Sequence, residues 1–169
     1  MKEPSREAAA TIWVAAVIAR TDPDRAEGIV HSSIEDIDRS SARAEIAAAV
    51  ADRDPGRAEA IVRLIEDRRT LATAAAGVAT VIAATEPNRA RLLIEDSERL
   101  ARSIEDSYSQ SKALVHVART IATIELDRAK EIGSSLEDPE ARAKVQAAVA
   151  EECNERPLLR RCACCGSGI

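Results

Sequence analysis

Cysteine is the residue type in this chain with the most distinctive chemistry. Cys162, Cys164 and Cys165 lie within the last eight residues, and Cys153 precedes them. The two arginines at 160–161 favour the thiolate form, which is the nucleophile and the metal ligand. Such thiolates could bind a soft ion such as Cu(I), and Zn is a weaker alternative because C-x-x-C spacing is missing. The tail could equally be the substrate of a modifying enzyme, or have no role.

The other ionisable residues form no catalytic motif. His31 and His116 stand alone, without a second ligand at metal-binding spacing. Glu-Asp pairs recur at the ends of short phrases, where they suit helix caps and solvated edges better than acid–base catalysis. No Gly-rich phosphate loop occurs, and no motif surrounds a Ser or Cys nucleophile. The chain is therefore predicted to be no enzyme and to need no cofactor, with Cu or Zn at the tail cysteines as the alternative.

One arginine recurs in the first turn of four predicted helices. These arginines are Arg25, Arg57, Arg89 and Arg128. The helix dipole disfavours a cation at that end, so each arginine is expected to have an acidic partner. In stacked units the expected pairs are Arg25–Asp54, Arg57–Glu86 and Arg89–Glu125. The pattern predicts a structural ladder of ion pairs between units, with an anion-binding stripe as the alternative.

These arginines belong to a phrase that the chain repeats. An acid starts each copy at positions 22, 54, 86 and 125, so the steps are 32, 32 and 39 residues. Pro follows the acid in three copies, which is a helix-start signal because the acid caps free N–H groups and Pro lacks a donor. A β-branched residue followed by Ala, eight and four residues before each acid, marks a buried stripe on the preceding helix. Such a period is typical of stacked helical hairpins.

The pattern predicts an all-α fold, a right-handed superhelix of stacked antiparallel helical hairpins. Helices are expected at 6–20, 23–37, 40–52, 55–68, 70–84, 87–105, 109–124, 126–137 and 139–154. Residues 1–156 would form the repeat domain of about four hairpins and a terminal helix, and 157–169 a flexible Cys-rich tail. The step of 39 residues exceeds the others by 7, which is about two helical turns. Helix 87–105 should therefore project about 10 Å beyond its neighbours, and its apolar residues Leu92, Leu100 and Ile104 are expected to cover an adjacent helix or to meet a partner, such as a second copy of the chain.

Composition narrows the class further. Aromatic residues make up 1% of the chain, and Gly and Pro number six each, which argues against an all-β fold. Trp13 and Tyr108 are interpreted either as binding anchors or as core residues. A net charge of −5 and the lack of interleaved aromatics disfavour nucleic-acid binding. No apolar run approaches the roughly 20 residues that cross a bilayer, and a cytoplasmic location is expected.

A helical hairpin that closes with Asp-Pro before the next unit, with alanines in its second helix, resembles the tetratricopeptide repeat. The resemblance covers residues 8 to 156, although the period of 32 differs from the family's roughly 34 residues, and a HEAT-like relative is the alternative. It implies an α-solenoid that acts as a non-catalytic scaffold for a protein or peptide. Candidate binding residues are Glu27, His31, Arg63, Leu92, Glu95 and Leu100.

Two classes of function therefore remain. The first is the binding scaffold, whose partner would be a protein, a peptide or a second copy of the chain. The alternative is a folded leader or carrier, whose tail thiols are modified by an enzyme or bind a soft metal. Neither nucleic acid nor a membrane is an expected partner.

Overall fold

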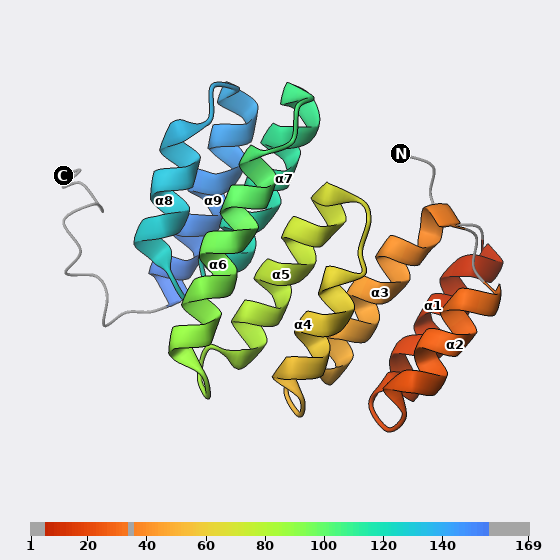
Figure 1. Ribbon diagram of the computed structural model, residues 1–169. Coiled ribbons are helices and arrows are strands. Elements are labelled where there is room, and N and C mark those ends of the chain that lie inside the picture. The colour runs from red at the N-terminus through yellow and green to blue at the C-terminus, as the bar shows by residue number, and fades with distance from the viewer. Residues whose placement is uncertain (1–5, 34–35, 156–169) are drawn as a thin grey trace, which may run out of the picture.

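The computed structural model describes residues 6–33 and 36–155, and every regular element in these ranges is an α-helix (Figure 1). The helices are α1 (Arg6–Ala19), α2 (Pro23–Ser33), α3 (Asp36–Val50), α4 (Pro55–Arg63), α5 (Arg68–Ile82), α6 (Pro87–Arg102), α7 (Ser107–Ile121), α8 (Leu126–Ser135) and α9 (Pro139–Glu155). The all-α class is confirmed. The largest boundary errors are at α2, which ends at Ser33 instead of 37, at α3, which begins at Asp36 instead of 40, and at α4, which ends at Arg63 instead of 68. The predicted tail, 157–169, lies outside the described residues.

Acidic residues stand at the helix starts, as the repeated phrases predict, but Glu86 and Glu125 make no side-chain capping hydrogen bond. Side-chain oxygens accept backbone N–H groups three residues further on at Asp22, Asp54, Asp67 and Asp106, with distances of 2.7–3.0 Å. Asp138 caps α9 in the same way. Hydrogen bonds from the Ser109 side chain and backbone lower the pKa of the Asp106 carboxyl. Asp67, Asp106 and Asp138 are each the second acid of a Glu-Asp pair. Their role as capping residues supports the structural interpretation of these pairs.

Consecutive helices pack as hairpins that follow one another in a row (Figure 1). We call α1, α3, α5 and α7 the first helices of the four hairpins, and α2, α4, α6 and α8 the second helices. Each first helix contacts the first helix of the next hairpin, and α7 contacts α9. In the described part of the chain, no two second helices have backbones in contact. The first helices thus form the continuous layer of the fold.

Alanine allows the first helices to approach one another closely. The repeated alanines Ala15, Ala47, Ala79 and Ala118 are completely buried. The β-branched residues that precede three of them, Ile46, Val78 and Val117, are buried as well. Only Val14, in the first hairpin, is exposed. Small and β-branched side chains fill these junctions without aromatic residues, because the helix axes lie close enough for short side chains to meet.

The second half of α6 lies against the core and does not project freely. α6 has 16 residues and α4 has 9, which reproduces the predicted excess of seven. Leu100 and Ile104 are partly buried against the core, whereas Leu92 is exposed. Arg68, at the start of α5, donates a hydrogen bond to the Ser103 carbonyl just after α6 ends. The extra turns therefore cover α5 beyond the point where α4 stops.

Gly133 in α8 marks the closest helix approach among the glycines, and a substitution there is expected to destabilise the protein. A Cβ at this position would lie 2.8 Å from Val145 Cγ1 of α9. We expect Gly133→Ala to lower the free energy of unfolding by about 1–2 kcal/mol, because overpacking outweighs the better helix propensity of Ala. Gly77→Ala in α5, where nothing lies within 4 Å, should instead stabilise the protein by up to about 1 kcal/mol. Urea unfolding of both variants tests the prediction, and an equal gain in both would contradict the close approach.

Candidate functional site

Ion pairs, and not backbone contacts, join the second helices to one another. The pairs are Arg57–Glu27, Arg89–Glu59 and Arg128–Glu98, and each glutamate precedes its arginine by 30 residues. Arg57 also pairs with Asp24 of α2. Arg57 Nη2 lies 3.0 Å from Glu27 Oε2, and Arg128 Nε lies 2.6 Å from Glu98 Oε2. The first turn of each later second helix is thus anchored to the second helix before it.

The predicted ladder therefore exists, but its predicted pairs are wrong. Each arginine reaches back to a glutamate of the preceding hairpin, and not forward to the capping acid of the following one. Two of the three predicted acids are already engaged. Asp54 accepts the Arg57 backbone N–H of its own helix, and Glu86 pairs with Arg89 at 3.0 Å. Arg25 lies in α2, which no second helix precedes in the described ranges.

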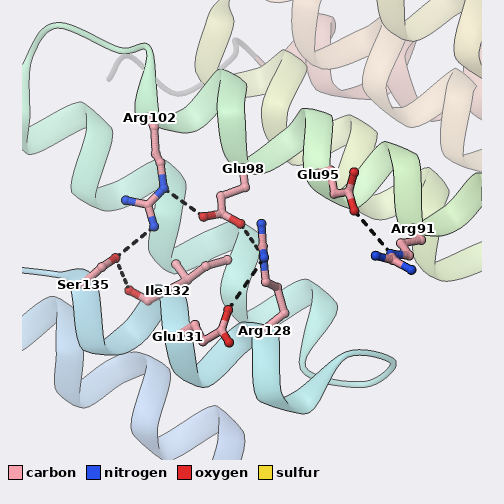
Figure 2. A network of polar contacts seen from close by, with 8 residues as sticks. All are labelled: Arg91, Glu95, Glu98, Arg102, Arg128, Glu131, Ile132 and Ser135. Carbon is pink, nitrogen blue, oxygen red and sulfur yellow. Dashed lines mark hydrogen bonds and ion pairs between the residues drawn. The ribbon is translucent and has the colours of Figure 1, made fainter.

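Glu98 is the ladder carboxylate that joins α6 to α8 (Figure 2). Its side chain is 11% exposed and accepts hydrogen bonds from Arg102 Nε at 2.8 Å and Arg128 Nε at 2.6 Å. The hydrogen bond that Arg128 donates to Glu98 raises the pKa of Arg128. Arg102 continues the network to Ser135 Oγ of α8 at 3.1 Å. At the first junction, by contrast, Glu27 Oε1 and Arg57 Nε are buried without a hydrogen-bond partner.

The position of Glu98 locates the insertion at residues 91–97. In the second hairpin the ladder segment is Arg57-Ala58-Glu59-Ala60-Ile61-Val62-Arg63. In the third it begins Arg89-Ala90 and resumes, seven residues later, as Glu98-Arg99-Leu100-Ala101-Arg102. Because seven residues are close to two helical turns, the side chains that follow the insertion point to the same side of α6 as the corresponding side chains before it. The N-terminal half of α6 pairs with α4, and its C-terminal half pairs with α8.

The length difference between α4 and α6 leaves a notch on the second-helix side. We call it the α4–α6 notch, a cleft of about 510 Å³ between α4, α5 and α6. Its apolar walls come from Val62, Leu71, Ala75, Leu92, Leu93 and Leu100, and charged residues of both signs stand at its sides, Glu59, Arg63, Arg89 and Asp96. The notch lies where α4 would continue if it were as long as α6. Leu92, Leu93 and Asp96 in its lining belong to the inserted residues.

The structure brings three of the six candidate binding residues together in this notch. They are Arg63, Leu92 and Leu100. Glu27 and His31 instead line a separate cleft of about 350 Å³ between α2, α3 and α4. Glu95 lines neither cleft and pairs with Arg91 at 3.3 Å on the surface of α6. The sequence-based set therefore divides between two places, and only the notch gathers apolar members.

Another cleft, on the first-helix side, contains residues that were not selected from the sequence. It has a volume of about 630 Å³ and crosses α3, α5 and α7, with Glu45, Arg69, Thr73, Lys112 and His116 among its lining residues. Burial and the nearby charges of Arg119 and Arg69 lower the pKa of His116. Glu45 and His116 both stand nine residues before a repeated acid. Their shared position in the repeat is the sequence signal that marks this cleft.

Most of the cysteines, which are the candidate ligands for a soft metal, lie outside the described residues. Cys162, Cys164 and Cys165 lie there, and Cys153 is partly buried against the core near the end of α9. Within residues 6–33 and 36–155, no group of three or more His, Cys, Asp or Glu side chains is placed to hold a metal ion. None of the helices described is both long and apolar enough to cross a membrane.

Comparisons of the chain with protein-family models, curated proteins and solved structures found no match. The structure and the internal repeat define the class of protein. It is an all-helical protein of successive hairpins joined by Arg–Glu pairs.

Proposed function

We propose that the chain is a non-catalytic binding scaffold, a TPR-like α-solenoid that holds a partner in the α4–α6 notch. Backbone contacts between successive first helices, without backbone contacts between the second helices, support the solenoid. When one row of helices packs more closely than the other, the row curves toward the closer side. Repetition of that curvature over four hairpins would give the right-handed superhelix. The second helices, and with them the notch, would then lie on the outer side.

The notch itself carries the proposal. Its volume of about 510 Å³ falls within the roughly 300–1,000 Å³ of typical binding sites. Leu92 is 62% exposed at its edge, although Leu71 and Leu100 inside it are partly buried. Exposed apolar surface beside a preformed cleft favours a partner with apolar side chains. A binding scaffold uses such a cleft directly, without a reacting group.

The shape of the notch indicates the kind of partner. It replaces about two turns of helix between α4 and the end of α6, so a short helical segment fits the space. Such a segment would present two apolar side chains one turn apart, as amphipathic helices do in hydrophobic grooves. Arg63 and Asp96 at the sides would orient it through polar contacts. We infer that the partner is a protein segment with an amphipathic helix.

A display library of random peptides, selected on the whole protein, tests the proposal. We expect enriched peptides to carry apolar residues three or four positions apart. Leu92→Asp should weaken their binding at least about tenfold, since tenfold corresponds to about 1.4 kcal/mol. Val81→Asp, at an exposed valine of α5 outside the notch, is the control and should leave binding unchanged. Peptides that bind Leu92→Asp as tightly as the wild type would contradict the notch, and loss with Lys112→Glu would point to the first-helix cleft.

A further inference from the structure

The outer face of α1 is the largest uncovered apolar helix face among the described helices. Ala10, Trp13, Val14 and Val17 are exposed on it, and Trp13 reaches 70%. Their spacing of three and four residues places them on one side of the helix. Between residues 8 and 19 the sequence has no charged residue, so α1 is apolar on its inner and its outer side. Helices that are apolar all round are normally buried on all sides.

The repeat shows what this face does in the other hairpins. Val14 corresponds to Ile46, Val78 and Val117, and all three are buried. Ala10 corresponds to Ala42, Ala74 and Ala113, which are buried too. The first hairpin differs from the later ones because no hairpin precedes it in the described residues. Ala10 and Val14 therefore occupy junction positions that no preceding hairpin covers in the described residues, whereas Trp13 and Val17 stand at positions that are exposed or half-buried in the later hairpins.

The other end of the row is built differently. The exposed surface of α9 carries charged residues, including Glu140 and Lys144, which pair at 2.7 Å, and Glu151. Polar outer surfaces are what the terminal units of repeat arrays need for solubility. Head-to-tail stacking of α1 on α9 would bury these charges against an apolar strip, which costs free energy. α9 is thus a poor partner for α1.

We propose that the strip Ala10–Trp13–Val14–Val17 on α1 is the interface of a two-fold dimer with a second copy of this chain. A two-fold contact places the same surface against itself, so a strip without charge meets no unpaired charge. Each copy then covers the α1 strip of the other. The contact involves essentially one helix face per chain, so it belongs to the small interfaces of below about 1,200 Å². We therefore expect a reversible dimer that dissociates on dilution.

The single tryptophan makes the interface directly observable. Trp13 is the only Trp in the chain, so intrinsic tryptophan fluorescence reports on this strip alone. Over a dilution series, we expect the emission maximum to move to longer wavelength as the mass, measured by sedimentation or light scattering, falls from two chains to one. Both transitions should occur in the same concentration range, because one event causes both.

Two matched variants test the assignment. Val17 is 50% exposed and stands five residues before the first repeated acid; Val81, 41% exposed, has the same place in the third unit. Val17→Glu should keep the helical spectrum and melting curve but give a single-chain mass and long-wavelength emission at every concentration. Val81→Glu should dimerise like the wild type. A single-chain mass for the wild type up to about millimolar concentration, or a dimer that survives Val17→Glu, would overturn the proposal.

Discussion

Replacing Glu98 with alanine is expected to lower the free energy of unfolding by about 2 kcal/mol, because two charge-assisted hydrogen bonds are lost. Glu98 is nearly buried and holds both Arg102 and Arg128, with distances of 2.8 and 2.6 Å. Without it, the two guanidinium groups face each other across the junction of α6 and α8. Each arginine is partly exposed and recovers some hydration, so the loss stays below that of a fully buried pair.

Glu95→Ala is the matched control on the same helix. Glu95 and Arg91 are both exposed and 3.3 Å apart (Figure 2). An exposed pair of this kind contributes about 0–1 kcal/mol, so Glu95→Ala should unfold at nearly the wild-type urea concentration. Arg128→Ala, combined with Glu98→Ala in a double-mutant cycle, should show a coupling that Arg91 and Glu95 do not. Equal unfolding midpoints for Glu95→Ala and Glu98→Ala would mean that the ladder does not hold the junction.

Helix starts marked by an acid-Pro pair were predictable, because the signal lies in neighbouring residues. The starts of α3, α5 and α7, which lack that pair, were placed two to four residues too late. An acid followed by Pro fixed the beginnings of α2, α4 and α6 to the residue. Helix ends were harder, and α4 shows why. The apolar Leu64 and Ile65 suggest that the helix continues, yet Asp67 caps the next helix through Thr70. That cap requires a non-helical residue, so α4 must stop before it.

The direction of the ladder could not be read from the period alone. A repeat shows which residues recur, but a recurring arginine has a neighbour on each side. The acceptor glutamates would have decided the question, since Glu27 and Glu59 both follow an arginine by two residues. In the third hairpin that position holds Arg91, and the acceptor is Glu98, seven residues later. The insertion thus concealed the very residue that completes the pattern.

Prediction of the notch would have required both the length of the insertion and knowledge of how α6 packs on α5. The extra seven residues were visible in the sequence, and they predicted a projection that covers an adjacent helix or meets a partner. The first alternative holds, because Leu100 and Ile104 pack against the core and α6 lies along α5. The uncovered space therefore appears beside α4, where the sequence has nothing to mark it. A cleft defined by where a helix ends depends on tertiary structure.

Two deletions of equal length should separate the ladder from the notch. Removing residues 91–97 joins Ala90 to Glu98 and restores the ladder segment as Arg-Ala-Glu-Arg-Leu-Ala-Arg. Removing residues 94–100 joins Leu93 to Ala101 and gives Arg-Ala-Arg-Leu-Leu-Ala-Arg. The two products differ at only two positions, and both make α6 as long as α4. Both should therefore lose the notch and the peptides selected on it.

Their stabilities should differ, because only one product keeps an acceptor for Arg128. Deletion of 91–97 retains Glu98, so the Arg128–Glu98 pair can re-form two turns closer to the start of α6. Deletion of 94–100 places Arg91 there, and two arginines face each other. We expect the second product to unfold with a free energy lower by roughly 2 kcal/mol or more than the first, measured by urea denaturation followed by circular dichroism. If the product lacking 94–100 proved as stable as the one lacking 91–97, the Arg–Glu ladder would not set the register between hairpins.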